Sequence, residues 1–422
     1  MRGRYSFAKQ YLKGGFSNLR ATLTIMDRGL VSDGAVGGRP AADAPETRST
    51  APRRHNRRLR GIDAARAIAV LGMVTVHFGP KPAPDAALVG LYGISHGRAS
   101  VLFVLLAGVG VALLVGDRSR KRPSLARGRL ILRGALLLPL GLWLQQLDHG
   151  ALVILQYYAV YFLFAALVLT LPDRWLLTGA AAALIAGPLI YLGGEVAAPE
   201  WFTRYTDPST LDHAVGKIVR DLLLAGAYPL SIWAAPLLVG LWLGRRDLAA
   251  AAVRWWLLVL GLAIALASAL AADGLAAAFG EMVWETGESR STNLLTDRPH
   301  SQMPLWMLGS IGSACAVLGG MLLLAVRLPR ATWPLVTTGQ LALTVYVGHL
   351  LLLDAYPELL RRETVLTGTI AVVVSMLLAA AACTLWRAIL SRGPLEAALA
   401  APWQIIERLA RPVIQQLAPR RG

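Results

Sequence analysis

Apolar residues follow one another along this chain in stretches of about 17 to 25, and short polar connectors separate these stretches. A helix of that length crosses the hydrocarbon core of a bilayer, which is about 30 Å thick. The pattern therefore predicts an all-α, polytopic transmembrane helical bundle. The ten helical spans that it predicts lie at 62–79, 99–116, 129–147, 150–171, 175–193, 222–244, 253–279, 305–326, 335–354 and 364–391.

The composition agrees with a membrane protein. Of the 422 residues, 55% are hydrophobic and 16% are charged, and the mean hydropathy is +0.52. A soluble globular domain is about half apolar and about a quarter charged. A soluble globule, a disordered chain and a disulfide scaffold are therefore excluded as the main class. The two cysteines, Cys315 and Cys383, lie inside apolar stretches, where we expect them to be packing residues.

Much of the net charge of +17 lies before the first span, where residues 1–60 hold 13 Lys and Arg against 4 Asp and Glu. We predict that residues 1–57 form a basic, disordered cytoplasmic tail near anionic lipid rather than a nucleic-acid site. The N-terminus continues into sequence rich in Gly, Ser, Pro and Ala, so no cleavable signal is predicted. Met26 is an alternative first residue.

The charges of the connectors predict the topology. Basic connectors follow the second span at 118–129, the sixth span at Arg245 and Arg246, and the eighth span at 327–330. By the positive-inside rule, these connectors and both termini face the cytoplasm of a multi-pass protein of the plasma membrane. Residues 393–422 are predicted to form an amphipathic, basic segment on the inner leaflet, beyond a transmembrane domain at 58–392.

Ionisable side chains inside the spans are candidates for function, because burying one in a bilayer costs at least a few kcal/mol. The first span carries Asp63, Arg66 and His77 on one helical stripe. Asp63 and His77 are about 21 Å apart along the helix axis, so one helix reaches from the inner side to the outer side. The alternative is a salt bridge between Asp63 and Arg66 at the helix start, with His77 as an interfacial residue.

Two further histidines lie near the predicted outer ends of spans. His96 belongs to SHGRASVLFVLLAG, in which Ser95 or Ser100 is a candidate cap of the following helix. The alternative is a solvated His96 at an ordinary interfacial cap. His349 lies in the ninth span, and Tyr158 in the fourth is a candidate lining residue of the same cavity. Aromatic residues at such depths also serve as packing or interface residues.

The sequence contains neither a Walker loop nor an HExxH zinc signature, and we predict no metal site.

The stretch from Arg58 to His77, RLRGIDAARAIAVLGMVTVH, resembles the first-helix signature of the heparan-alpha-glucosaminide N-acetyltransferase-like family and, more distantly, of acyltransferase-3 proteins. The bacterial branch of this family is similar, in the same order, to HGRASVLFVLLAG, ILQYYAVYFL, AYPLSIWAAPLLVGLWLGRRDL and PLVTTGQLALTVYVGHLL. The resemblance covers roughly residues 58–392. Ala67 replaces the usual Gly after the arginine, and the spacing from His77 to His96 is longer than in the animal enzyme.

The resemblance implies an integral membrane acyltransferase. Its expected donor is cytosolic acyl-CoA, with acetyl-CoA as the expected form, and its acceptor is a cell-envelope sugar, a glycolipid or an amine on the outer side. His96 resembles the catalytic histidine of the family, and His77 occupies the place of an Asn in the animal enzyme and of a His in acyltransferase-3 relatives. Direct transfer and an acyl-histidine intermediate both stay open.

The resemblance also implies roles for other side chains. Arg98, or the adjacent helix end, would stabilise the oxyanion. Asp63, Arg66, His349 and Tyr158 would position the reacting groups. The donor phosphates would meet some of six arginines, Arg66, Arg127, Arg129, Arg133, Arg245 and Arg246. A different class also stays open: a transporter or flippase for a lipid or small amphiphile, in which the polar stripe lines a pathway and no CoA binds.

Overall fold

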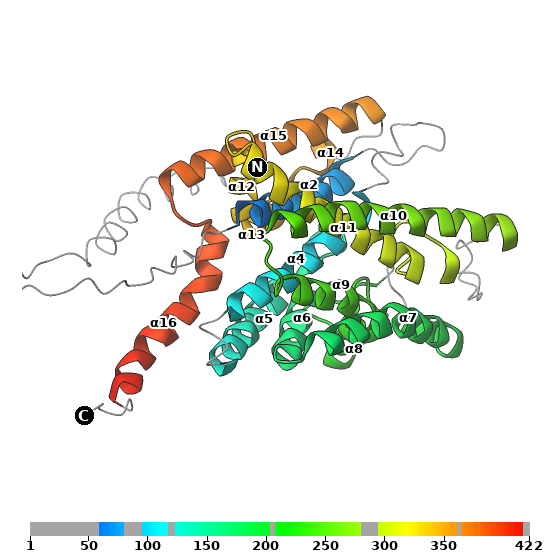
Figure 1. Ribbon diagram of the computed structural model, residues 1–422, viewed down its shortest axis with the longest axis horizontal. Coiled ribbons are helices and arrows are strands. Elements are labelled where there is room, and N and C mark those ends of the chain that lie inside the picture. Colours follow the sequence, from blue (N-terminus) through cyan, green and yellow to red (C-terminus); the bar gives the residue numbers. More distant parts are fainter. Residues whose placement is uncertain are drawn as a thin grey trace, which may run out of the picture. The chain divides into compact units, whose positions relative to one another are not determined.

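The computed structural model describes residues 59–79, 95–116, 123–202, 207–279, 294–360 and 364–416, and all regular secondary structure in these ranges is helical (Figure 1). These residues belong to one compact unit that begins at Arg58. The predicted tail at 1–57, with Met26, lies outside the described residues, as do the basic connector residues at 117–122.

The first half of the unit contains seven helical segments and two short turns of helix before α10. They are α2 (Arg60–Phe78), α4 (Arg98–Val115), α5 (Pro123–Gln145), α6 (Leu155–Val168), α7 (Asp173–Ala197), the 3₁₀ turn η1 (Pro199–Trp201), α8 (Val215–Arg220), the π turn η2 (Asp221–Ala225) and α9 (Leu230–Leu243). The second half contains α10 (Ala251–Phe279), α11 (Pro304–Arg327), α12 (Trp333–Gln340), α13 (Ala342–Ala355), α14 (Pro357–Leu360), α15 (Val365–Ile389) and α16 (Pro394–Gln416).

Every predicted span coincides with at least one helix, but fewer than ten of the described helices have the length and apolar composition of a membrane span. Six helices among the described residues are long and apolar enough to cross a membrane, and up to eight crossings result if each of two bent helix pairs counts as one. The bends measure 57° between the 215–225 segment and α9, and 78° between α12 and α13. α6, with 14 residues, is short, and α5 carries arginines in its first half. The expected count of about ten is therefore not confirmed.

Helix α2 lies inside the bundle, packed against α4, α11 and α12 (Figure 1). Four of its alanines, at positions 64, 65, 67 and 69, are fully buried. Small residues at these positions let the backbones of neighbouring helices approach closely. A Cβ atom on Gly61 would lie 2.5 Å from the Cα of Leu322 in α11. The predicted functional stripe of α2 therefore faces protein rather than lipid.

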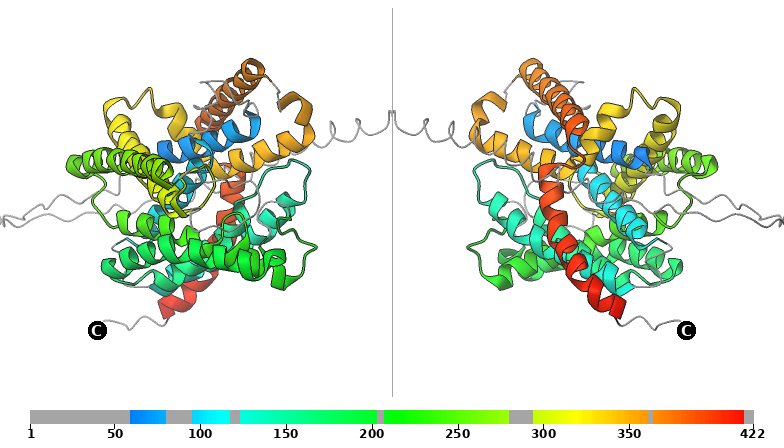
Figure 2. Two further views of the ribbon diagram at one scale, coloured as in Figure 1. Left: turned by 90° about the vertical axis from the view of Figure 1, so that its right-hand side faces the viewer. Right: turned by 90° about the vertical axis from the view of Figure 1, so that its left-hand side faces the viewer.

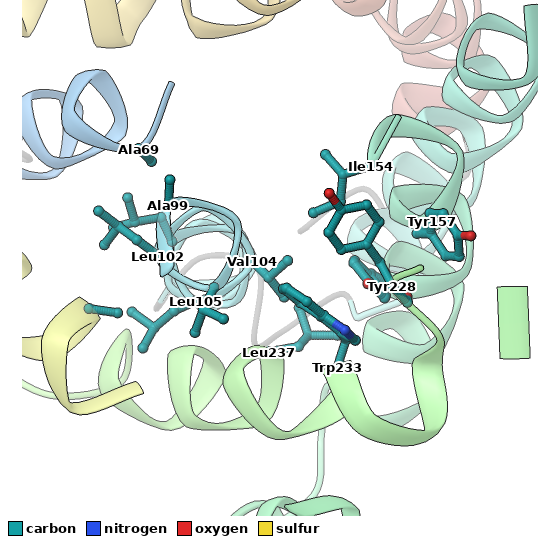
Figure 3. Packing of buried hydrophobic residues seen from close by; sticks show 14 of the residues in the cluster. Ala69, Ala99, Leu102, Val104, Leu105, Ile154, Tyr157, Tyr228, Trp233 and Leu237 are labelled. Atoms are coloured by element: carbon teal, nitrogen blue, oxygen red, sulfur yellow. Dashed lines mark hydrogen bonds between the residues drawn. The ribbon is translucent and has the colours of Figure 1, made fainter. Parts of the chain in front are cut away.

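A second close contact joins α4 to α9. A Cβ atom on Gly108 of α4 would lie 2.7 Å from the backbone nitrogen of Leu241, so only glycine fits at this crossing. Val104 and Leu105 of α4 lie near Trp233 and Leu237 of α9 in the apolar core (Figure 3). Helix α4 therefore packs closely against α9, and it also contacts α2.

Helices α10 and α15 lie at the edge of the bundle (Figure 2). Leu266 and Leu270 of α10 are more than half exposed, as are Leu377 and Leu378 of α15. Apolar faces of this extent are typical of helices that contact lipid. We therefore expect lipid to cover these apolar faces of α10 and α15, which the protein itself does not bury.

Candidate functional site

A cavity of about 510 Å³ opens between α2, α4, α5, α6, the α12–α13 break and α16. Its lining includes the side chains of Arg66, Arg129, Arg133, Tyr158, Gln340 and Trp403. A volume of this size is typical of small-molecule and cofactor sites. Three of the arginines that were predicted to meet donor phosphates, Arg66, Arg129 and Arg133, thus share one cavity.

Arg66 lines the cavity, and an ion pair with Asp63 holds its side chain in place. Nη1 of Arg66 donates to Oδ1 of Asp63 at 3.0 Å, and only 2% of the Asp63 side chain is exposed. Gly110 of α4 gives the guanidinium room, since a Cβ atom there would lie 3.2 Å from Nη2 of Arg66. The salt bridge at the helix start and the stripe facing the bundle, which the sequence presented as alternatives, are therefore both present.

Arg129 and Arg133 lie on neighbouring turns of α5 and differ in their partners. Arg129 donates to Oε1 of Glu407 at 2.6 Å and lies 5.3 Å from the ring centroid of Trp403. Arg133 has no carboxylate partner among the described residues, and the charges of Arg129 and Arg66 act on it. The cavity therefore carries positive charge that the described residues do not neutralise, which favours an anionic ligand.

The remaining predicted phosphate contacts lie elsewhere. Arg127 donates to the carbonyl of Ala166 at 3.1 Å, and Arg245 donates to the carbonyls of Leu169 and Leu171. These carbonyls end α6 or follow it, and cationic side chains commonly satisfy such groups. Arg245 and Arg246 also pair with Asp173 at the start of α7. Neither Arg245 nor Arg246 lines the cavity that contains Arg66, Arg129 and Arg133.

His77 contacts His349 directly. Nδ1 of His77 lies 3.0 Å from Nε2 of His349, and the two rings are nearly parallel, at 8°. Nδ1 of His349 lies 3.3 Å from the carbonyl oxygen of Val345, one turn earlier in α13. Two histidines from the first and ninth predicted spans thus form one hydrogen-bonded pair, which neither span's sequence indicates alone.

Three more histidines, His96, His149 and His300, lie near His77. Five of the seven histidines in the chain therefore gather in one region. Sequence reasoning missed His149 and His300, which lie in connectors with no motif around them.

His149 and His300 have local contacts that explain their positions. His149 is fully buried, with Nε2 2.8 Å from the carbonyl of Leu144 and Nδ1 accepting from the backbone N–H of Ala151. These contacts fit a neutral imidazole with its proton on Nε2. His300 has a φ of 63° and stacks on Trp306. A positive φ at a histidine is set by tertiary packing and leaves no clear trace in the sequence.

Helix α4 begins differently from the prediction. Its N-cap is Gly97, with a φ of 71°, and no side chain caps the helix. A Cβ atom on Gly97 would lie 2.5 Å from the Trp306 ring, so a serine cap is replaced by a glycine pressed against an aromatic residue. The expectation that Ser95 or Ser100 caps α4 is therefore wrong.

Arg98, the first residue of α4, has a buried Nε without a hydrogen-bond partner, and its charge acts on Asp297. Burial raises the pKa of Asp297, repulsion from Asp273 raises it further, and Arg98 opposes both effects. Arg98 thus faces a connector carboxylate, and its proposed role towards an oxyanion stays a prediction.

A series of aromatic rings joins the cavity to the histidine pair. The ring of Tyr158, which lines the cavity, lies 5.4 Å from that of Phe103, and Phe103 lies 6.4 Å from Tyr346. The ring of Tyr346 in turn lies 5.2 Å from that of His349. Contiguous side-chain packing therefore links the wall of the cavity to the histidine pair, although neither histidine lines the cavity.

These features define a class: a multi-pass helical membrane protein with a basic cavity and, near it, a cluster of buried and half-buried histidines. Residues 58–257 match the sequence model of a family described as heparan-alpha-glucosaminide N-acetyltransferase, catalytic. This segment of the chain belongs to that family, and the predicted resemblance is confirmed. A search of curated proteins finds no match. The matched segment includes Arg66, His77 and Arg133, whereas Gln340 and His349 lie beyond it.

Proposed function

We propose that this protein is an integral membrane acyltransferase that moves an acetyl or other acyl group from cytosolic acyl-CoA to an acceptor on the other side. A cell-envelope sugar, a glycolipid or an amine would serve as the acceptor. The observation that carries this proposal is the cavity with uncompensated arginine charge, which aromatic side chains connect to a histidine pair. Membership of the matched segment in an acetyltransferase family supports the same conclusion.

The cavity has the chemistry that acyl-CoA requires. The phosphates of CoA carry several negative charges, and guanidinium groups bind phosphate in a planar, two-pronged geometry. Arg133 is the best candidate for the first contact, since no described carboxylate competes for it. Arg66 and Arg129 are held in place by Asp63 and Glu407, so they lose little conformational freedom on binding.

The distance between Arg66 and His77 along α2 sets how long the bound donor would have to be. Arg66 and His77 are 11 residues apart, which corresponds to about 16 Å along a helix axis. A donor with its phosphates near Arg66 would need an extended arm to bring its thioester to His77. CoA has its charged groups at one end and its thioester at the other, joined by such an arm.

The histidine pair suggests which atom is the base. If Nδ1–H of His349 donates to the carbonyl of Val345, then Nε2 of His349 is unprotonated and accepts from Nδ1–H of His77. Nε2 of His77 then carries a free lone pair. This nitrogen would take the proton from an attacking hydroxyl or amine while the acceptor atom bonds to the thioester carbonyl. The C–S bond would then break, and the leaving thiolate would take the proton from His77. A positioned base of this kind contributes about 10² to 10⁴ in rate.

Turnover of acetyl-CoA by the purified, full-length protein tests the proposal. We expect His77→Ala to lower the release of CoA thiol by about 10²-fold or more while the thermal unfolding temperature stays close to that of the wild type. His213→Ala, in the 207–214 connector, is the matched control and should retain activity. Wild-type turnover by a folded His77→Ala variant would remove His77 as the base.

A further inference from the structure

Tyr158 has a buried hydroxyl group that lacks a partner. Its side chain is 5% exposed and lines the cavity, and its Oη makes no hydrogen bond. The ring is held by Phe103 and by Tyr161 and Phe162 of the same helix, so the hydroxyl cannot easily turn away. Buried tyrosine hydroxyls normally find a hydrogen-bond partner. The hydroxyl of Tyr158 therefore offers an O–H donor to a ligand in the cavity.

Gln340, which lines the same cavity, has an acceptor atom without a hydrogen-bond partner, whereas Tyr158 has a donor. Its Nε2 donates to Oδ2 of Asp63 at 3.3 Å, whereas its Oε1 is buried without a hydrogen-bond partner. An ionised carboxylate only accepts hydrogen bonds, so Asp63 fixes which end of the amide points towards it. The amide oxygen, which points away from Asp63, is the buried atom without a partner, and it offers an acceptor to a ligand.

The break between α12 and α13 places Gln340 at the cavity. Gln340 is the last residue of α12, and the chain bends by 78° before α13 begins. The preceding residue, Gly339, lies against the backbone of Asp63, where a Cβ atom would collide with the carbonyl oxygen. The bend and this contact hold Gln340 next to Asp63 and Arg66.

A secondary amide carries the two complementary groups, a carbonyl that would accept from Tyr158 and an N–H that would donate to Gln340. Arg66 lies near both side chains, since it shares Asp63 with Gln340 and its charge acts on Tyr158. We propose that Tyr158 and Gln340 form an amide-binding subsite for the linker arm of an anionic donor. The inference rests on the proposed function, in which the donor is acyl-CoA, whose arm contains secondary amides.

Equilibrium binding of two probes to the purified full-length protein tests the subsite. CoA carries both the phosphates and the arm, whereas adenosine 3′,5′-bisphosphate carries phosphates and no arm. We expect Tyr158→Phe and Gln340→Met each to weaken CoA binding by about 3- to 10-fold, the usual range for one hydrogen bond, and to change bisphosphate binding by less than about 2-fold.

Two control variants separate this effect from other causes. Tyr161→Phe removes a hydroxyl that already donates to the carbonyl of Tyr228, and it should leave CoA binding unchanged. Arg133→Gln should weaken both probes together, because it removes a phosphate contact.

Three outcomes would overturn the subsite. In the first, Tyr158→Phe and Gln340→Met leave CoA binding unchanged. In the second, they weaken the binding of both probes equally, which would show that the two residues do not contact the arm. Tyr158→Phe could also lower kcat without changing CoA affinity, which would assign its hydroxyl to the reacting carbonyl. A wild-type protein that binds neither probe would instead reject the donor cavity of the proposed function itself.

Discussion

Asp63 shows how one buried carboxylate can organise two side chains. It accepts from Arg66 of its own helix and from Gln340, which lies 277 positions away in the sequence. A buried carboxylate is tolerated only with such partners, because an unpaired charge in the interior is expensive. The sequence offered the pair with Arg66 as an alternative to a functional stripe on one helix. The contact with Gln340 depends on how α12 packs against α2.

His349 is the residue whose substitution best tests the orientation of His77. We expect His349→Leu to lower kcat by about 10²-fold, because His77 loses the acceptor that keeps its Nδ1 protonated. His349→Gln should retain more activity than His349→Leu, since its side-chain oxygen can accept from His77 in place of Nε2. Steady-state kinetics with acetyl-CoA measure both, with the KM for acetyl-CoA expected to change little.

Equal activity of the Leu and Gln variants would contradict this role for His349. A loss of folding in both variants, measured by thermal unfolding, would show that the pair supports the structure instead.

At the scale of elements, the broken helix pair α12–α13 is the feature that builds the cavity wall. Glu396 of α16 closes the break: its Oε1 accepts from the backbone N–H groups of Leu343 and Thr344, at 2.8 and 3.0 Å. These N–H groups begin α13 and would otherwise lack partners. A carboxylate at a helix N-terminus is also favoured by the helix dipole. The C-terminal amphipathic helix, predicted only as a segment on the inner leaflet, therefore contributes to the cavity.

The contact between α12 and α2 predicts the effect of adding one methyl group. We expect Gly339→Ala to destabilise the protein by about 1 to 3 kcal/mol, because the new Cβ would collide with the carbonyl of Asp63. Thermal unfolding in detergent measures this change, and CoA affinity should fall with it as Gln340 moves.

Gly348→Ala in α13 is the matched control. A Cβ atom at Gly348 meets no atom within 4 Å, so this variant should be neutral or stabilised by up to about 1 kcal/mol. Similar losses of stability in both variants would show that helix propensity, and not the close contact, is responsible.

At the scale of the whole molecule, the cavity draws on chain segments from both ends of the unit, with Arg66 from α2 and Trp403 from α16. A ligand that bridges such segments stabilises the folded state relative to the unfolded state. Stabilisation of the folded protein by CoA therefore distinguishes the acyltransferase from a transporter or flippase that binds no CoA.

We expect CoA at about 100 times its Kd to stabilise the wild-type protein by about 2.7 kcal/mol. Arg133→Gln should require a higher CoA concentration for the same shift, because it removes the cavity's uncompensated charge. Thermal unfolding across a CoA titration measures both. The absence of a shift at any concentration would reject a CoA-dependent enzyme and favour transport.

The helical class, the approximate positions of the long apolar helices and the placement of Asp63, Arg66 and His77 on one stripe all follow from the sequence. Those conclusions rest on helix periodicity and on the length of apolar stretches, which are local properties of the chain. They also sufficed for the family resemblance, whose motifs are continuous in sequence.

Which predicted arginines share a cavity depends on how the helices pack, since Arg129 and Arg133 line it while Arg245 and Arg246 pair with Asp173. The packing of the helices also decides the contact of His77 with His349 and the placement of Gln340 beside Asp63. These contacts join residues 272 and 277 positions apart. Periodicity gives the face on which a residue lies, but only the packing of one helix against another decides which side chain it meets.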